Sequence, residues 1–212
     1  MRFIDSPEAR IPVIMTTIKE VSSVESKGAR KVLVAYLSQT GNTKKIAEAI
    51  YEVLPEPKEI KPIREVTTLD GYDLSFLGFP IHRLGPDEQE KAYLEKLTKS
   101  RTIALFITHM APEEAPELEG WLQRFRDAAS NANLVGMFHC QGQASWLVKF
   151  ILRFAPDPVL REARKKDNSK GKPDAIRLER ARVFAKEVMK EFQMSNVFVR
   201  SQHEHVMVTE VK

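Results

Sequence analysis

Cysteine is almost absent from this sequence: Cys140 is the single one among 212 residues, so no disulfide can form within the chain. Disulfides persist in oxidising compartments, and a chain without them fits a reducing one. No stretch approaches the ~20 apolar residues that a membrane-spanning helix needs. Asp5, Glu8 and Pro12 interrupt the region where a secretory signal would be continuously apolar. We therefore expect a cytoplasmic protein.

Motifs of several functional classes are also missing. The sequence has no zinc-binding spacing, P-loop, G-x-G-x-x-G fingerprint or nucleic-acid motif. His139 has no cysteine or carboxylate at metal-ligand spacing, so we expect no metal site. Cys140 ends an apolar run, which is typical of an inert buried thiol. With 42% hydrophobic and 29% charged residues, the chain predicts one globular domain with appendages.

The net charge of +4 is small, and it comes from one region. Residues 144–172 contain eight basic side chains against three acidic ones, while the rest of the chain is close to neutral. Such a patch suits an acidic protein or an anionic lipid surface, so peripheral membrane contact is one alternative. A solvated basic face is the favoured interpretation.

The clearest pattern is an apolar strand that runs into a polar loop and then a helix. Residues 32–37 are apolar without alternation, which is typical of a strand buried on both faces of a parallel sheet. Residues 46–54 carry apolar side chains at helical spacing. The loop between them offers hydroxyl, amide and backbone donors for a phosphate: Ser38, Gln39, Thr40, Gly41, Asn42 and Thr43. An ordinary N-capped turn would need only one of these residues.

This loop resembles the phosphate-binding signature T/S-x-T-G-N-T of the flavodoxin family at Ser38, Thr40, Gly41, Asn42 and Thr43. The resemblance implies that neutral donors bind the phosphate of FMN. It also implies an α/β fold with a doubly wound, five-stranded parallel sheet of order 2-1-3-4-5 and helices on both faces.

Two further loops resemble those that flank the flavin ring in this family. Residues 73–80 form an apolar strand that ends in Gly-x-Pro, and residues 102–108 form another. The resemblance places one group of residues on one side of the ring: Phe79, Pro80, Ile81 and His82. It places a second group on the other side: Thr108, His109, Met110 and Ala111. Because the carboxyl ends of parallel strands meet at one edge, the three loops should share a crevice.

The second of these loops departs from the family pattern, since it has His109 and Met110 where an aromatic residue is common. The plainer interpretations are a surface-loop histidine for His82, a loop turn for His109 and a core side chain for Met110, which is favoured.

The flavodoxin-like unit should cover residues 30–193. Further strands are expected at 58–66 and 133–140, and further helices at 86–99, 116–129 and 174–192. The last helix should bury one apolar face: Ile176, Leu178, Ala181, Phe184, Ala185 and Val188.

Both terminal extensions, residues 1–29 and 194–212, are β-prone in their apolar parts. Residues 11–18 and 197–211 lack other partners for their backbone groups, so we expect them to pair with each other or with a second subunit in a homodimer.

The implied function is electron transfer by bound FMN to a redox partner protein. The alternative is an FMN-dependent oxidoreductase that acts on a small substrate or a quinone, for which no catalytic residue is identified. Residues 144–172 could roof its pocket as two short helices, and a similar insertion occurs in the flavodoxin-like oxidases of porphyrinogen biosynthesis. Packing of this segment on the sheet edge is the favoured interpretation.

Overall fold

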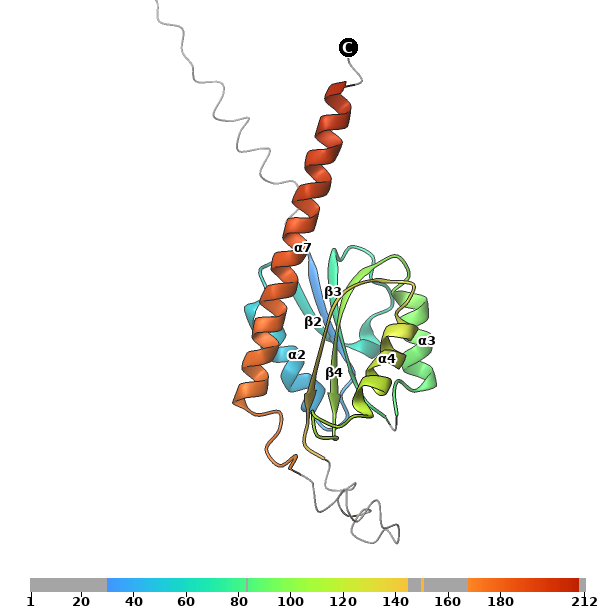
Figure 1. Ribbon diagram of the computed structural model, residues 1–212, viewed down its shortest axis with the longest axis vertical. Helices are drawn as coiled ribbons and strands as arrows, with labels where there is room; N and C mark the ends of the chain where they lie inside the picture. The colour runs from blue at the N-terminus through green and yellow to red at the C-terminus, as the bar shows by residue number, and fades with distance from the viewer. Residues whose placement is uncertain (1–29, 83, 145–149, 151–167, 210–212) are drawn as a thin grey trace, which may run out of the picture.

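Five parallel strands form one sheet in the order β2-β1-β3-β4-β5 (Figure 1). The computed structural model describes residues 30–82, 84–144, 150 and 168–209. The strands are β1 (Val32–Tyr36), β2 (Lys58–Pro62), β3 (Leu74–Pro80), β4 (Thr102–His109) and β5 (Asn133–Gln141). The predicted fold class and strand order are therefore confirmed.

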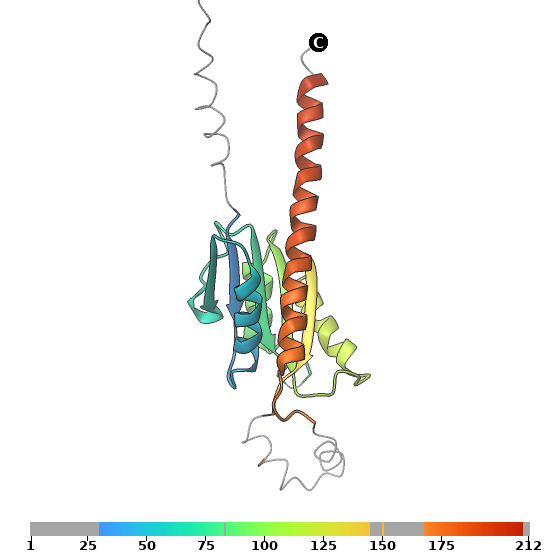
Figure 2. The same ribbon diagram turned by 90° about the vertical axis from the view of Figure 1, so that its left-hand side faces the viewer.

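Helices cover both faces of the sheet, as Figure 1 shows with the sheet between two groups of helices, and Figure 2 looks onto the face that one of these groups covers. The helices on one face are α2 (Asn42–Val53) and α7 (Ala175–Thr209), and those on the other are α3 (Glu88–Leu97) and α4 (Leu118–Ala128). Both faces of the central strands are thus buried, which explains why the strands read as continuous apolar runs.

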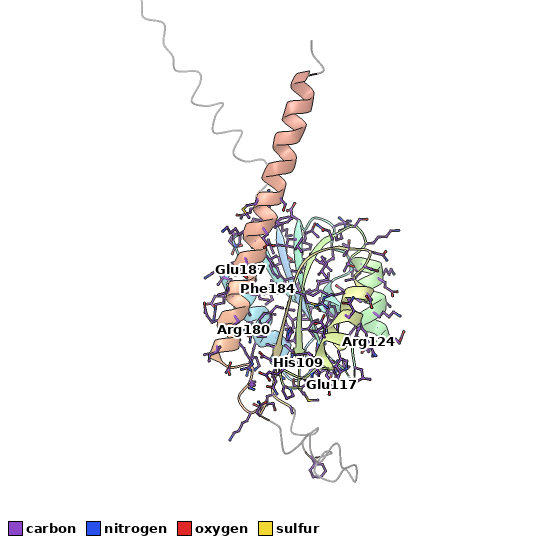
Figure 3. The ribbon with its side chains drawn as sticks, viewed as in Figure 1. His109, Glu117, Arg124, Arg180, Phe184 and Glu187 are labelled. Atoms are coloured by element: carbon purple, nitrogen blue, oxygen red, sulfur yellow. The ribbon has the colours of Figure 1, made fainter. Side chains whose placement is uncertain are left out.

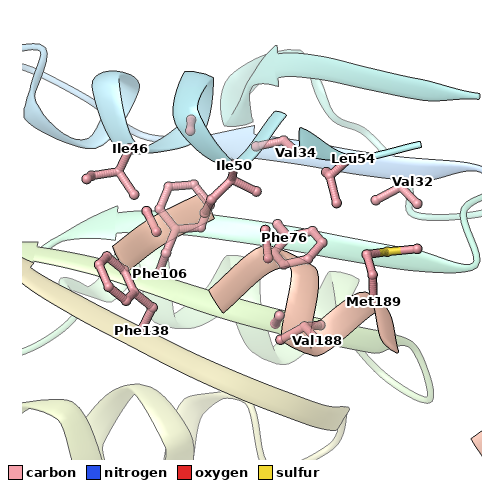
Figure 4. Close-up of a cluster of buried hydrophobic side chains, with 14 of the residues drawn as sticks. Val32, Val34, Ile46, Ile50, Leu54, Phe76, Phe106, Phe138, Val188 and Met189 are labelled. Atoms are coloured by element: carbon pink, nitrogen blue, oxygen red, sulfur yellow. The ribbon is translucent and has the colours of Figure 1, made fainter. Parts of the chain in front are cut away.

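The core on the α2 and α7 face contains three packed aromatic rings. The ring of Phe184 on α7 lies 6.1 Å from that of Phe76 on β3 and 5.6 Å from that of Phe138 on β5. Ile46 and Ile50 bring α2 onto the same layer (Figure 4). Burial of this apolar surface, at about 25 cal/mol per Å², is the main favourable contribution to folding.

Two local signals set the element boundaries near the site. The second strand ends at Pro62 instead of continuing to Val66, because a short 3-10 helix, η1 (Ile63–Glu65), follows at once. Helix α3 begins with a capping box, in which Asp87 and Glu90 each accept a hydrogen bond from the other's backbone N–H.

The C-terminal tail is not a strand. Helix α7 continues through Thr209, so the strand expected at 197–211, and its pairing as a strand with 11–18, is wrong. No Gly or Pro occurs between Ala175 and Thr209, and a helix satisfies its backbone groups without a partner strand. Ile176, expected inside, is 71% exposed. The second half of α7 extends past the sheet in both views (Figures 1 and 2).

Several expectations fall on residues outside the described ranges. The strand at 11–18 and the two short helices within 144–172 belong to these. Among the helices that the structure describes, none is long and apolar enough to span a membrane.

Candidate functional site

The carboxyl ends of β1, β3 and β4 surround one cavity at the lower edge of the sheet in Figure 1. The strand order reverses here, because the chain passes from β1 to β2 on one side and then to β3 on the other. Open α/β sheets bind ligands at such a switch point. The lining residues come from four loops: Gln39, Thr40, Asn42, Thr43, Pro80, Ile81, His82, Thr108, His109, Met110 and Gln143.

Four of the residues expected at the site do not line this cavity, and two of these four lie close to it. Ser38 and Gly41 line an adjacent hollow on the other side of the first loop, together with the cationic side chains of Lys44 and Arg64. Phe79 and Ala111 line neither space.

The first loop presents free donors to this region. Gly41 has a φ of 85°, a left-handed conformation that glycine adopts at little cost, and α2 starts directly after it. Within the described residues, no side chain caps this helix, so its first N–H groups stay available to an anion. The Ser38 hydroxyl oxygen is buried and has no hydrogen-bond partner among those residues. A ligand oxygen is the partner that this arrangement suits.

Other polar side chains of the loop are already engaged. Thr43 is buried, and its hydroxyl oxygen lies 2.8 Å from that of Thr108 on β4. The Asn42 side-chain amide donates to the Gln143 carbonyl at 2.8 Å. In this loop, hydrogen bonds hold the side chains of Thr43 and Asn42 in place. The Ser38 hydroxyl has no hydrogen-bond partner among the described residues, and Gln39 and Thr40 are exposed.

The second loop differs from the expectation at one position. Phe79 is 1% exposed and packs in the core, where its ring lies 6.0 Å from that of Phe125 and 6.3 Å from that of Tyr93. Successive side chains of a strand point to opposite faces, so Phe79 points toward α3 and α4. The Phe79 side chain, expected beside the ring, therefore does not line the cavity. Pro80 and Ile81 do line the cavity, and Ile81 N–H donates to the Thr108 carbonyl at 2.7 Å.

The third loop presents one exposed and one buried side chain. Met110 is 47% exposed, so the favoured core position for it was wrong. His109 is buried, and its Nδ1 lies 2.9 Å from the Ala111 carbonyl oxygen. A carbonyl only accepts, so Nδ1 carries the proton and Nε2 accepts from His139 Nδ1 at 3.2 Å. Burial lowers the pKa of His109 to about 4, which keeps the ring neutral at pH 7.

The sequence analysis did not place the segment after β5 at the site. The expected strand order could have done so, because it sets the end of β5 beside the end of β4. Gln143 lines the cavity, and Gly142 N–H donates to the His109 carbonyl at 2.8 Å. The Gln141 side-chain amide donates to the Met110 carbonyl at 2.9 Å. These contacts fix the fourth wall of the site.

A charged cluster behind the third loop holds it to α7. Glu113 accepts from Arg177 at 2.6 Å, from Arg180 at 2.7 Å and from the Gln141 N–H at 3.1 Å. Burial opposes the negative charge of Glu113, but these donors outweigh it and lower its pKa to about 2. In Figure 3, Arg180 lies on the part of α7 that is near the end of the sheet at which His109 completes β4.

A wider, shallow hollow lies between α7 and β5. Its volume is about 520 Å³. It is lined by four apolar side chains, Phe138, Ile176, Val183 and Phe184, and by charged side chains such as Glu187. Three of its lining residues, Arg180, Phe184 and Glu187, follow one another along α7 (Figure 3), and the hollow lacks the strand-end loops that supply donors. The cavity at the switch point is therefore the candidate site.

Fold and cavity together define a doubly wound α/β protein with its ligand crevice at the switch point. A model of the flavodoxin domain matches residues 33–186, and the chain belongs to this family. The chain is similar to the flavodoxin-like domain-containing protein BilS of Clostridioides difficile (strain CD3). The two are 32% identical over 170 residues, which cover 75% of this chain and 96% of that protein.

A solved flavodoxin structure shares the fold. A flavodoxin of Streptococcus pneumonia TIGR4 matches with a TM-score of 0.50 and 14% identity over 76% of this chain and 99% of its own. A flavoprotein of Lactobacillus acidophilus NCFM, solved in complex with FMN, matches with a TM-score of 0.44 and 21% identity over 52% of this chain and 93% of its own.

Proposed function

We propose that this chain binds FMN at the switch-point cavity and transfers electrons through it. The observation that carries this proposal is the first loop, where Ser38, whose buried hydroxyl has no partner among the described residues, and the uncapped start of α2 line one hollow beside the cavity. These groups suit a terminal phosphate. Membership of the flavodoxin-domain family supports the same ligand.

The residues present fit such a ligand. The phosphate would meet Ser38, Thr40 and the backbone N–H groups of α2, with Lys44 nearby. Pro80 and Ile81 would contact one part of the flavin ring and Met110 another. Bound FMN would supply reversible one- and two-electron chemistry, and the protein would orient the ring and set how much water reaches it.

The cavity formed by the described residues favours electron transfer over turnover of an enclosed substrate. Its volume is about 140 Å³. Pockets that bury a small ligand usually measure about 300–1,000 Å³. Against the described residues alone, a ligand as large as FMN would leave an edge exposed, which suits a redox partner protein that docks there. We extend the proposal to a reducing, cytoplasmic compartment, which the single cysteine favours.

The phosphate contact can be tested by titrating apoprotein with FMN and with riboflavin, which lacks the phosphate. We expect FMN to bind at least about tenfold more tightly, since charge-assisted hydrogen bonds contribute about 1.5–3 kcal/mol each. Ser38→Ala and Thr40→Val should weaken FMN binding and leave riboflavin binding nearly unchanged. Thr67→Val, at an exposed threonine between η1 and β3, is the matched control. Equal affinity for the two flavins would contradict the phosphate assignment.

A further inference from the structure

Three metal-ligating side chains converge beside the candidate site, between β3 and α3. His82 follows β3, while Asp87 and Glu90 belong to the first turn of α3. One ligand atom from each lies within 4.8 Å of the others. Glu90 is only 3% exposed, which is unusual for a carboxylate.

The capping box uses one oxygen of each carboxylate and leaves the other free. Asp87 Oδ1 accepts from Glu90 N–H, and Glu90 Oε2 accepts from Asp87 N–H, both at 2.8 Å. Glu90 Oε1 is buried without a hydrogen-bond partner among the described residues, and so is His82 Nε2. These two atoms face each other at 3.6 Å, too far apart for a hydrogen bond.

A buried carboxylate without a cation is costly. Within the part of the chain that the structure describes, no lysine or arginine forms an ion pair with Glu90. A bound cation would compensate this charge.

We propose that His82, Asp87 and Glu90 bind a divalent transition-metal cation such as Zn²⁺. Ligand atoms around tetrahedral zinc lie about 3.3 Å apart, close to the separation of His82 Nε2 and Glu90 Oε1. Asp87 is exposed, so its free oxygen can move inward and the cation can enter from solvent. A nitrogen among the ligands favours zinc over magnesium or calcium, which prefer oxygen alone.

Metal binding would also hold one wall of the candidate site. His82 lines the switch-point cavity, so a ligated imidazole would fix the loop after β3 in one orientation. This inference does not depend on FMN binding, because the three ligands and their unpartnered atoms belong to the protein alone.

Calorimetric titration of the full-length, chelator-treated protein with Zn²⁺ tests the site, with and without added FMN. We expect one Zn²⁺ per chain, and affinity at least about tenfold weaker in Glu90→Gln and in His82→Gln. Glutamine also completes a capping box, so Glu90→Gln should keep α3 folded, which circular dichroism verifies. Glu88→Gln removes the same charge from an exposed position of the same turn and is the matched control.

Glu90→Gln keeps all five histidines of the chain, and His82→Gln keeps the other four. Zinc binding elsewhere on the chain would therefore survive in them unchanged. Parent-like affinity in either variant, or no binding to the parent below millimolar Zn²⁺, overturns the proposal. Failure of FMN to bind would leave the zinc result unaffected, so the two proposals fail separately.

Discussion

The hydroxyl oxygens of Thr43 and Thr108 lie 2.8 Å apart in the buried interior, although the two residues are 65 positions apart in the sequence. This hydrogen bond joins the first turn of α2 to the end of β4, and so ties the first loop of the site to the third. One hydroxyl must donate and the other accept, so neither position tolerates a purely apolar replacement without leaving its partner unsatisfied.

Thr108→Val should destabilise the protein by about 1–3 kcal/mol, because it leaves the buried Thr43 hydroxyl without its hydrogen-bond partner. The double variant Thr43→Val/Thr108→Val removes both polar groups and should cost less than the sum of the two single changes. Urea denaturation of the four proteins measures this coupling. Strictly additive losses would show that the hydroxyl pair is not coupled in solution.

The stability of the fold should depend on the protonation of His109. Its pKa is about 4 in the folded protein against an ordinary value of 6.5, so the unfolded chain binds more protons between these values. Stability should therefore be full above pH 6.5 and fall on acidification to pH 4, by about 3 kcal/mol in the limit.

The comparison with His109→Gln isolates this effect. Glu90 changes the stability of the protein in the opposite direction. Because burial raises its pKa from the ordinary 4.5 to about 7, its contribution to stability is lost as pH rises between these values. The difference between parent and variant, measured by denaturation at each pH, removes that contribution. A difference that does not change between pH 6.5 and 4.5 would contradict the assignment.

Glu113→Gln should lower stability by about 1–3 kcal/mol, since it takes from the largely buried guanidinium of Arg177 one of its two carboxylate partners and leaves only Asp174. The neighbouring Glu114 is exposed, and Glu114→Gln is the matched control. Because the parent Glu113 has its pKa lowered to about 2, its contribution should persist above pH 4.5 and fall as pH drops from there toward 2. Equal stability of the two variants at pH 7 would count against the cluster.

Gly142→Ala should weaken FMN binding roughly tenfold, because over-packing typically costs 1–3 kcal/mol. A Cβ at Gly142 would lie 2.9 Å or less from three side-chain atoms of Asn42, and so push that residue from the first loop. Gly120 on α4 has open space around it, so Gly120→Ala should keep FMN affinity and add up to about 1 kcal/mol of stability. Fluorescence titration of FMN compares the two variants, and parent-like affinity of Gly142→Ala would show that Asn42 adapts.

The strands and their convergence could be predicted because buried parallel strands have a distinct composition. Residues 32–37 are apolar at successive positions, and the polar residues that follow must meet those after β3 and β4 at one edge. A strand buried on both faces has no alternation, however, so its pattern does not say which way Phe79 points. That direction follows only from the register of β3 with its neighbours.

Other features depend on contacts that no local pattern contains. The bond between Glu113 and Arg177 joins positions 64 apart, and it forms only after α7 has packed on the sheet. The extension of α7 to Thr209 opposes the β-branched composition of residues 197–211, since helix propensities differ by less than about 1 kcal/mol per ordinary residue.

The ring of Phe184 belongs to the last helix of the described chain, yet it packs against Phe76 and Phe138 from strands made much earlier. At ~5–20 residues per second, these strands leave the ribosome seconds before the helix that covers them. Helix α2 can cover its part of this apolar face early, but the part that α7 covers stays open to water during that interval. The chain should therefore be most prone to aggregation while its sheet still lacks α7. This period ends when α7 has left the ribosome and packs on the sheet.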